Sequence, residues 1–433
     1  MPEIGTLRLP ARVHFGYGAR DQLPEIVRVH GRRVFAVVDP FLTGTPFLAS
    51  AVAELEAVGV EVRVHSDVTP ELPVDTLDTA GALARDYAPD VIVAIGGGSA
   101  LDAAKLIALL AAYGGPLSSY YGENLVPGPV VPIVALPTTA GTGSEVTPVA
   151  VVSDPDRELK VGISSPFLVP AAAIVDPELT LGSPATVTAY SGIDALVHAV
   201  ESYTARPFDL DFAAPLPVFT GRNALAEPIA LQAARHLGPW LEVAVASPGD
   251  RRARSEVARG SLLGGIAFGS TGTHLCHALQ YPIGALTKTP HGLGTGLMLP
   301  YMLDTIRHTV PERVAALGAA LESAPGAPAA SGGGLNASDA SDGPIAASAT
   351  GAGEPGHADG VSPERTIARI VEINRAIGIP ASLAEIGLTR DQLPRIAELA
   401  LGAQRLLAIA PIEPTRDTLL EILERAHDGV LTP

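Results

Sequence analysis

The sequence predicts an α/β domain built on a parallel sheet, followed by an all-α domain. Three observations support this prediction: strand-like and helix-like runs alternate in the first half, glycine-rich loops follow two of the strand-like runs, and apolar residues keep helical spacing through most of the second half. Alternation of strands and helices implies a parallel sheet with helices on both faces. We place the boundary near Leu181–Pro184, which gives domains at residues 1–182 and 183–433.

The first half contains compact, β-branched runs and amphipathic segments in turn. The strand-like runs cover residues 34–38, 60–65, 91–95 and 131–136. Helical spacing covers residues 45–59 and 74–87. Residues 147–161 differ, because two strand-like runs flank the turn sequence Asp154-Pro155-Asp156. This pattern predicts a β-hairpin that leaves the sheet.

The second half carries few strand-like runs. Helical spacing is clear in residues 184–205, 223–245, 250–268 and 365–378. Residues 323–361 are rich in Ala, Gly, Ser, Pro and Asp and hold too few apolar side chains to offset the entropy of ordering. We expect a flexible surface insertion there; a functional lid is the less favoured alternative, because loops absorb extra length at small cost.

Composition limits the class of protein. The chain has 433 residues with 47% hydrophobic content, which favours more than one domain. Its formal net charge of −17 argues against nucleic acid or an anionic membrane surface as the main partner. Cys276 is the single cysteine, so no intramolecular disulfide can form. The sequence shows neither a signal peptide nor an apolar run long enough to span a bilayer, and we expect a cytoplasmic protein.

Two loops predict a nucleotide site. Gly96, Gly97, Gly98 and Ser99 stand between a strand-like run and an amphipathic helix, where free helix amides favour a diphosphate. The alternative is a plain strand-to-helix turn. Residues 135–147 form a second loop with clustered hydroxyl groups and glycines, after another strand. Loops at the carboxyl ends of two strands mark the usual ligand crevice of an open α/β sheet.

Asp39 ends the first strand-like run. A carboxylate there often binds the adenosine ribose and disfavours a 2′-phosphate, which indicates NAD rather than NADP. A turn or helix-capping role before Pro40 explains the same residue equally well.

Asp194 and His198 are spaced i, i+4 within a mostly apolar segment, so they share one face of a predicted helix. Together with His277 and His291 they offer one carboxylate and three imidazoles, a set that suits Fe²⁺ or Zn²⁺. On spacing alone, a buried Asp–His pair with unrelated core histidines remains the alternative.

Four motifs in one order carry a family resemblance: GGGSALDAAK, PTTAGTGSEVT, GIDALVHAVESY and HALQYPIGALTKTPHGLG. From about Val13 to Asp428 the chain resembles the iron-containing (group III) alcohol dehydrogenase family. The resemblance implies a Rossmann-like NAD-binding domain and a helical metal-binding domain, the dehydroquinate synthase-like fold, with Fe²⁺ or sometimes Zn²⁺ as the metal. It implies metal ligation by Asp194, His198, His277 and His291. It implies nucleotide contacts by Asp39, Gly97, Gly98, Ser99, Asp102, Thr138, Thr139, Thr142, Lys160 and Leu179.

Tyr281 departs from the family pattern. Many members carry a histidine there, four residues after the third ligand, and it is often proposed to relay protons. The stretch THLCHALQYP is similar to the hydroxyacid–oxoacid transhydrogenase branch. Tyr281 is therefore our candidate proton donor, with ribose hydroxyls and water as the alternative. His274 and Cys276 are expected to be packing residues.

The resemblance implies reversible hydride transfer between NAD(H) and a small alcohol or aldehyde, in a homodimer. The alternative is a hydroxyacid–oxoacid transhydrogenase with tightly bound NAD, in which Lys288, Arg307 or another cation holds the substrate carboxylate. A cyclase of the dehydroquinate synthase type is less favoured, because the residues around His277 and His291 are mostly apolar. A non-catalytic NAD- or metal-binding protein is disfavoured by the intact ligand set.

Overall fold

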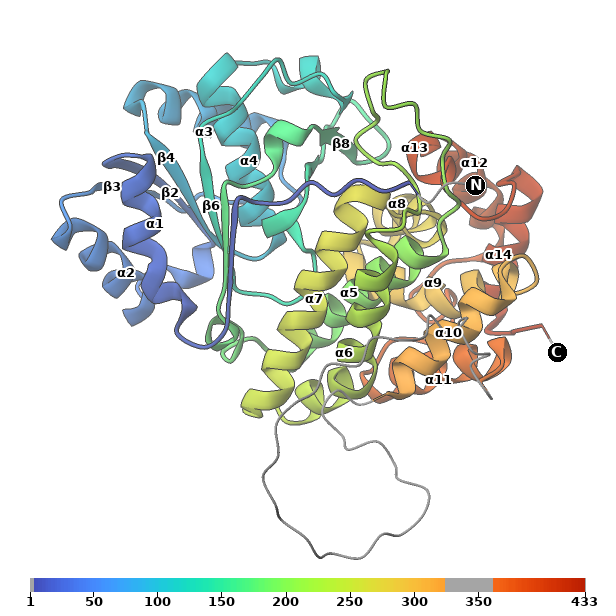
Figure 1. Cartoon of the computed structure of the whole chain (residues 1–433). Coiled ribbons are helices and arrows are strands. Elements are labelled where there is room, and N and C mark those ends of the chain that lie inside the picture. The colour runs from blue at the N-terminus through green and yellow to red at the C-terminus, as the bar shows by residue number, and fades with distance from the viewer. Residues whose placement is uncertain (1–3, 324–360, 433) are drawn as a thin grey trace, which may run out of the picture.

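The computed structural model describes residues 4–323 and 361–432, and in this part of the chain the first half forms a six-stranded sheet (Figure 1). Every pair of neighbouring strands in it is parallel, as predicted. The strands, in spatial order, are β1 (Arg12–Phe15), β9 (Ala172–Val175), β6 (Ile133–Pro137), β4 (Val91–Gly96), β2 (Arg33–Val38) and β3 (Glu61–His65).

Side chains of the central strands alternate between two apolar layers. In β2, Val34, Ala36 and Val38 face one layer, and Phe35 and Val37 face the other. Burial on both faces explains why these strands read as continuous apolar runs. The helices that cover the sheet are α1 (Leu23–His30), α2 (Pro46–Ala57), α3 (Val74–Tyr87) and α4 (Gly98–Tyr113).

The predicted hairpin is confirmed, although its second strand lies later than expected. Strands β7 (Val149–Val152) and β8 (Val161–Ser164) pair antiparallel, and β5 (Gly122–Glu123) joins β8. The connection between the two strands covers residues 153–160 and is longer than the Asp-Pro-Asp turn; residues 155–158 within it are exposed. Strands β1 and β9 had not been predicted; β1 is half-exposed and charged, and β9 is short and rich in alanine.

The second half of the described chain is helical, as predicted. Its central helix is α5, which is buried along nearly its whole length and packs against α6, α7 and α9. The helices are α5 (Ala185–Thr204), α6 (Glu227–Ala246), α7 (Arg251–Thr271), α8 (Leu275–Thr287), α9 (His291–Ile306), α10 (Pro311–Glu322), α11 (Pro363–Ala376), α12 (Leu393–Leu401), α13 (Gln404–Leu407) and α14 (Arg416–Asp428).

Helix α7 joins the two halves. Ala258 and Leu262 of α7 share an apolar cluster with Val146 and with Ala173 and Val175 of β9. The change from mixed to helical structure falls between β9 and α5, and the exact division at residues 182 and 183 stays a prediction.

Nearly all of the predicted insertion at 323–361 lies outside the described residues. Within the described ranges, no helix has both the length and the apolar character that crossing a membrane requires.

Candidate active site

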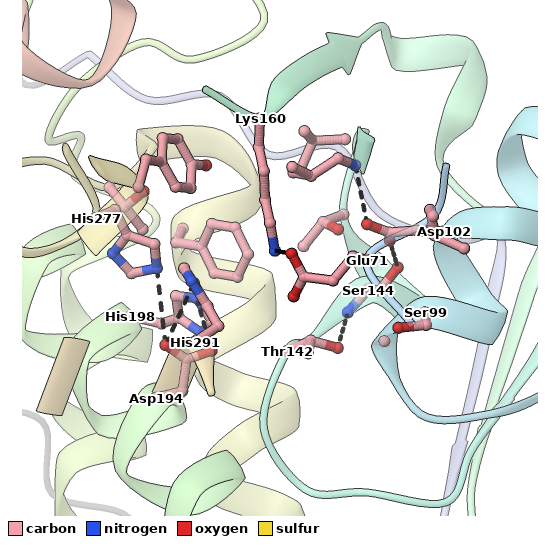
Figure 2. Close-up of a pocket in the computed structure, with 18 of the residues that line it drawn as sticks. Glu71, Ser99, Asp102, Thr142, Ser144, Lys160, Asp194, His198, His277 and His291 are labelled. Atoms are coloured by element: carbon pink, nitrogen blue, oxygen red, sulfur yellow. Dashed lines mark hydrogen bonds and ion pairs between the residues drawn. The ribbon is translucent and has the colours of Figure 1, made fainter. Parts of the chain in front are cut away.

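A cavity of about 240 Å³ lies between the carboxyl edge of the sheet and the helical half. Figure 2 shows side chains from both halves pointing into it, with the histidine cluster on one side and the glycine-loop residues on the other. Residues from the loops after β4 and β6 form one wall, the β7–β8 hairpin forms a second, and α5, α7, α8 and α9 form a third. Glu71 and Leu72 before α3, Phe219 between α5 and α6, and Arg405 on α13 also line it. The cavity therefore brings together side chains from both predicted domains.

The four predicted metal ligands meet in this cavity. Asp194 and His198 lie one turn apart on α5, His277 lies in the first turn of α8, and His291 is the first residue of α9. The Nε2 atom of each histidine lies 3.8 Å from a carboxylate oxygen of Asp194. That separation is too long for a hydrogen bond, so the nitrogens surround the carboxylate without being bonded to it. One oxygen ligand and three nitrogen ligands can hold a divalent transition metal.

Glu201 fixes the orientation of His277. Its Oε2 atom accepts a hydrogen bond of 2.6 Å from Nδ1 of His277, and its two oxygens also accept the backbone amides of His274 and Cys276. Burial opposes ionisation of Glu201, but the two histidines and these donors outweigh it and lower its pKa to about 2. The carboxylate can therefore only accept, Nδ1 carries the proton, and Nε2 of His277 is left buried with no hydrogen-bond partner.

This arrangement is the one expected around a metal-binding imidazole, whose second nitrogen donates to a carboxylate. Sequence reasoning missed Glu201. The signal was present, because Glu201 follows Asp194 by seven residues and His198 by three, on the same face of α5.

Thr295 holds the carboxylate of Asp194. Its hydroxyl, on α9, donates a hydrogen bond of 2.8 Å to Oδ1. Burial alone would raise the pKa of Asp194, but the three imidazoles and this hydroxyl together hold it below the ordinary value. Asp194 is thus an anion at neutral pH, ready to offset the charge of a cation.

His198 and His291 are neutral at neutral pH. Burial lowers the pKa of each imidazole to about 4, against the opposing effect of Asp194. Phe268 covers one face of His198, with ring centroids 4.2 Å apart, and the ring of Tyr281 lies 6.1 Å from that of His291. Neutral imidazoles present the lone pairs that metal coordination requires.

Two loops lie side by side: the glycine loop, Gly96–Ser99, and the hydroxyl loop, the part of residues 135–147 that follows β6. The amide of Thr138 donates to the carbonyl oxygen of Gly96 at 2.9 Å, which extends the register of β4 and β6 into the loops. A Cβ atom on Gly98 would lie 2.6 Å from Cγ2 of Thr142, so glycine is required at this contact. Helix α4 begins at Gly98 with its first amides at the cavity edge, beside Ser99.

Asp102 and Lys160 line the cavity, but both already have partners. Asp102 accepts the Ser144 hydroxyl at 2.6 Å and the Val151 amide at 3.0 Å, so its carboxylate ties α4 to the hydroxyl loop and to β7. Lys160 forms an ion pair of 2.8 Å with Glu71, drawn in Figure 2. Sequence reasoning missed Ser144 and Glu71, whose positions depend on packing between distant elements.

The remaining predicted nucleotide residues lie outside the cavity walls. Asp39 accepts a hydrogen bond of 3.1 Å from the Phe41 amide, the capping role that was its alternative interpretation, and its own amide donates to the carbonyl of Ile95 at the end of β4. Leu179 packs on the apolar layer under α1 and α2. Thr139 lines a smaller neighbouring cavity.

Comparisons with known proteins agree with this geometry. A family model described as iron-containing alcohol dehydrogenase matches residues 10–177, and a model of the family's C-terminal part matches residues 188–342 and 344–427. Long-chain-alcohol dehydrogenase 1 of Geobacillus thermodenitrificans is 33% identical over 99% of this chain and 98% of its own length. The mitochondrial hydroxyacid-oxoacid transhydrogenase of Caenorhabditis briggsae is 29% identical over 96% and 88%.

A solved structure supports the fold. The crystal structure of a 1,3-propanediol oxidoreductase is 28% identical in sequence, with a TM-score of 0.83 over 98% of this chain and 100% of that chain.

Proposed function

The chain belongs to the iron-containing alcohol dehydrogenase family, and from that premise we propose that it transfers hydride between NAD(H) and a small alcohol or its aldehyde or ketone. The observation that carries the proposal is the cavity itself. In it, donor atoms of Asp194, His277 and His291 lie within 4.8 Å of one another, with His198 beside Asp194, and they face a glycine loop at the carboxyl ends of parallel strands.

Asp194, His198, His277 and His291 are the proposed metal ligands, with Fe²⁺ as the expected ion and Zn²⁺ as the alternative. The unpartnered Nε2 of His277 supports this assignment, since a buried nitrogen without a partner is costly unless a ligand completes it. A bound divalent ion would act as a Lewis acid on the carbonyl or alkoxide oxygen of the substrate. Glu201 and Thr295 would keep two of the donors in place.

The proposed NAD-binding residues are those of the two loops and their neighbours. The amides at the start of α4 would face the diphosphate, and the closely packed loops would keep the nicotinamide end beside the histidine cluster. Asp39, directly after β2, supports a preference for NAD over NADP, and Leu179 packs on the apolar cluster that contains Val38 of that strand. The proposed contacts are Asp39, Gly97, Gly98, Ser99, Asp102, Thr138, Thr139, Thr142, Lys160 and Leu179.

Tyr281 is the proposed proton donor of the cavity wall. Burial raises its pKa above the ordinary value, so its hydroxyl stays protonated at neutral pH and can donate to an alkoxide. We further propose a homodimer, as the family resemblance implies, and a cytoplasmic location. Light scattering of the purified protein tests the assembly.

The second candidate is a hydroxyacid–oxoacid transhydrogenase. It is favoured by the relative of that name and by the THLCHALQYP stretch. In that mode NAD would remain bound while a hydroxyacid and then an oxoacid react.

Both modes can be tested in one screen. Protein reconstituted separately with iron and with zinc is assayed for NADH oxidation with aldehydes, ketones and 2-oxoacids. We expect turnover with free NADH and an aldehyde. Turnover between a hydroxyacid and an oxoacid without added cofactor would instead favour the second candidate. Inactivity with every aldehyde, ketone and oxoacid, with or without NADH, would refute both.

A further inference from the structure

Arg405 lines the cavity beside the proposed catalytic groups. It lies on the short helix α13, which packs against α8, the helix that carries His277 and Tyr281. Burial raises the pKa of Tyr281, and the guanidinium of Arg405 is close enough to oppose that rise. The adjacent residues Leu406 and Leu407 are buried in the helical core, so α13 is anchored.

The guanidinium of Arg405 is held in place by an aromatic ring. Its central carbon lies 4.5 Å from the ring centroid of Phe219, which is itself only 4% exposed. The segment after α13 is tied down as well, because the backbone amide of Arg206 donates to the carbonyl of Ile409 at 2.9 Å. Stacking on an aromatic face leaves the N–H groups at the guanidinium edge available for an anion.

The other charged groups in the cavity wall are compensated. Lys160 is paired with Glu71 at 2.8 Å, Asp102 accepts two hydrogen bonds, and Asp194 lies among three imidazoles. Among the described residues, no Asp or Glu side chain forms an ion pair with Arg405, and its guanidinium lies over the ring of Phe219. A cation in a partly apolar cavity without a carboxylate partner marks a place for an anionic ligand.

We propose that Arg405 binds an anionic group of the substrate, an inference that rests on the proposed function. The enzyme would then act on aldehydes and alcohols that carry a carboxylate or sulfonate away from the reacting carbon. Val149, Val151 and Phe268 line the same cavity, and these apolar side chains suit a short apolar linker between the reacting carbon and the anionic group. Arg307, a cation considered from the sequence, forms ion pairs with Asp304 and Glu364 outside the cavity walls.

The test compares 4-oxobutanoate with its uncharged methyl ester as substrates of the metal-reconstituted enzyme. We expect wild-type kcat/KM to favour the anion. Arg405→Gln should lower the ratio of the two kcat/KM values by about tenfold to a hundredfold, because a hydrogen bond to a charged group is lost, with the change mainly in KM. Arg405→Lys keeps the positive charge but loses the paired N–H donors of the guanidinium. Its ratio of kcat/KM values should therefore lie between those of the wild-type enzyme and Arg405→Gln.

Arg395→Gln is the matched control. Arg395 is exposed, forms an ion pair of 2.7 Å with Glu158 and lies outside the cavity, so its loss should leave the ratio unchanged. A second readout is the binding of succinate, a non-reactive dicarboxylate, measured by calorimetry on the same proteins; Arg405→Gln should weaken it about tenfold or more.

The outcomes separate the two proposals. The role of Arg405 would be overturned if Arg405→Gln lowered kcat/KM equally for both aldehydes, or if the wild-type enzyme preferred the ester. Either result would leave the dehydrogenase proposal intact. Wild-type inactivity toward both aldehydes and toward uncharged alcohols would instead count against the proposed function. If the Arg405 variants fail to fold, the wild-type enzyme still tests the substrate class, because a wild-type preference for the ester would overturn the proposal.

Discussion

Nδ1 of His277 lies 2.6 Å from Oε2 of Glu201, and both side chains are buried between α5 and α8. The Glu201 carboxylate also accepts two backbone amides, from His274 and Cys276. It therefore sets the conformation of the chain entering α8 as well as the rotation of the imidazole ring. Glu201 is a positioning residue, acting on the proposed metal through His277.

The first prediction is that Glu201→Gln weakens metal binding by about tenfold to a hundredfold, the usual effect of removing such a carboxylate. Metal content after dialysis against graded chelator concentrations measures the change. Glu256→Gln is the matched control, because Glu256 pairs with His236 at 2.7 Å away from the cavity. Equal metal content in the two variants after dialysis would show that Glu201 has only a structural role.

The second prediction concerns protons released on metal binding. Burial alone would lower the pKa of His277, but Glu201 outweighs burial and raises it above the ordinary value, whereas the pKa values of His198 and His291 are lowered to about 4. At pH 6 only His277 is then protonated among these ligands. Metal binding should release about one proton, and affinity should rise with pH from about 4 up to the pKa of His277.

The number of released protons can be measured by calorimetric titration with Zn²⁺ at pH 6. The titration is repeated in buffers of different ionisation enthalpy, because the heat depends on the number of protons that the buffer takes up. Glu201→Gln removes the cause of the raised His277 pKa, so the release should fall toward zero. Release of two or three protons from the wild-type protein would mean that His198 and His291 are also charged, against the prediction.

Much of the fold could be predicted because its signals are local. The apolar runs of β2, β4 and β6 and the spacing in α2, α3, α5 and α7 depend on which neighbours along the chain share a face. Strands β1 and β9 lack that signal, since their pairing with each other and with β6 is set by tertiary contacts.

The residues of the site also differ in whether the local sequence could predict them. Asp194 and His198 are one helical turn apart, so spacing alone places them on one face of a helix. Spacing could not bring His277 and His291 to them, and the family resemblance assigned all four residues as metal ligands. Glu201 was missed although it lies on the same face of α5. Arg405 had no local signal, because its place in the cavity depends on how α13 packs against α8.

The third prediction is that His277→Ala abolishes metal-dependent turnover while leaving NADH binding largely intact. The variant removes one proposed ligand, but the loops at Gly98 and Thr142 belong to the sheet half. Steady-state assays and NADH fluorescence titration measure the two properties separately. His236→Ala, another buried histidine that pairs with a glutamate, controls for the loss of an imidazole. Full activity of His277→Ala would contradict the ligand assignment.

The last prediction concerns the contact of Gly143 with Gly265, where the hydroxyl loop crosses α7. Gly143 has a φ of +62°, and a Cβ atom on it would lie 2.4 Å from Cα of Gly265. Alanine would add the strain of the left-handed conformation to a clash with helix backbone, so Gly143→Ala should lower the free energy of unfolding by about 2–5 kcal/mol. Chemical denaturation measures this loss.

Gly182→Ala is the control for that measurement, because a Cβ atom there meets no heavy atom within 4 Å. Since Gly143 stands between Thr142 and Ser144 of the cavity wall, the shift that accommodates the new methyl group must also move these two hydroxyls. The Michaelis constant for NADH should therefore rise along with the loss of stability. A stable Gly143→Ala protein with unchanged NADH kinetics would show that the loop tolerates displacement from α7, and that the close approach of the two glycines is not what positions the cavity wall.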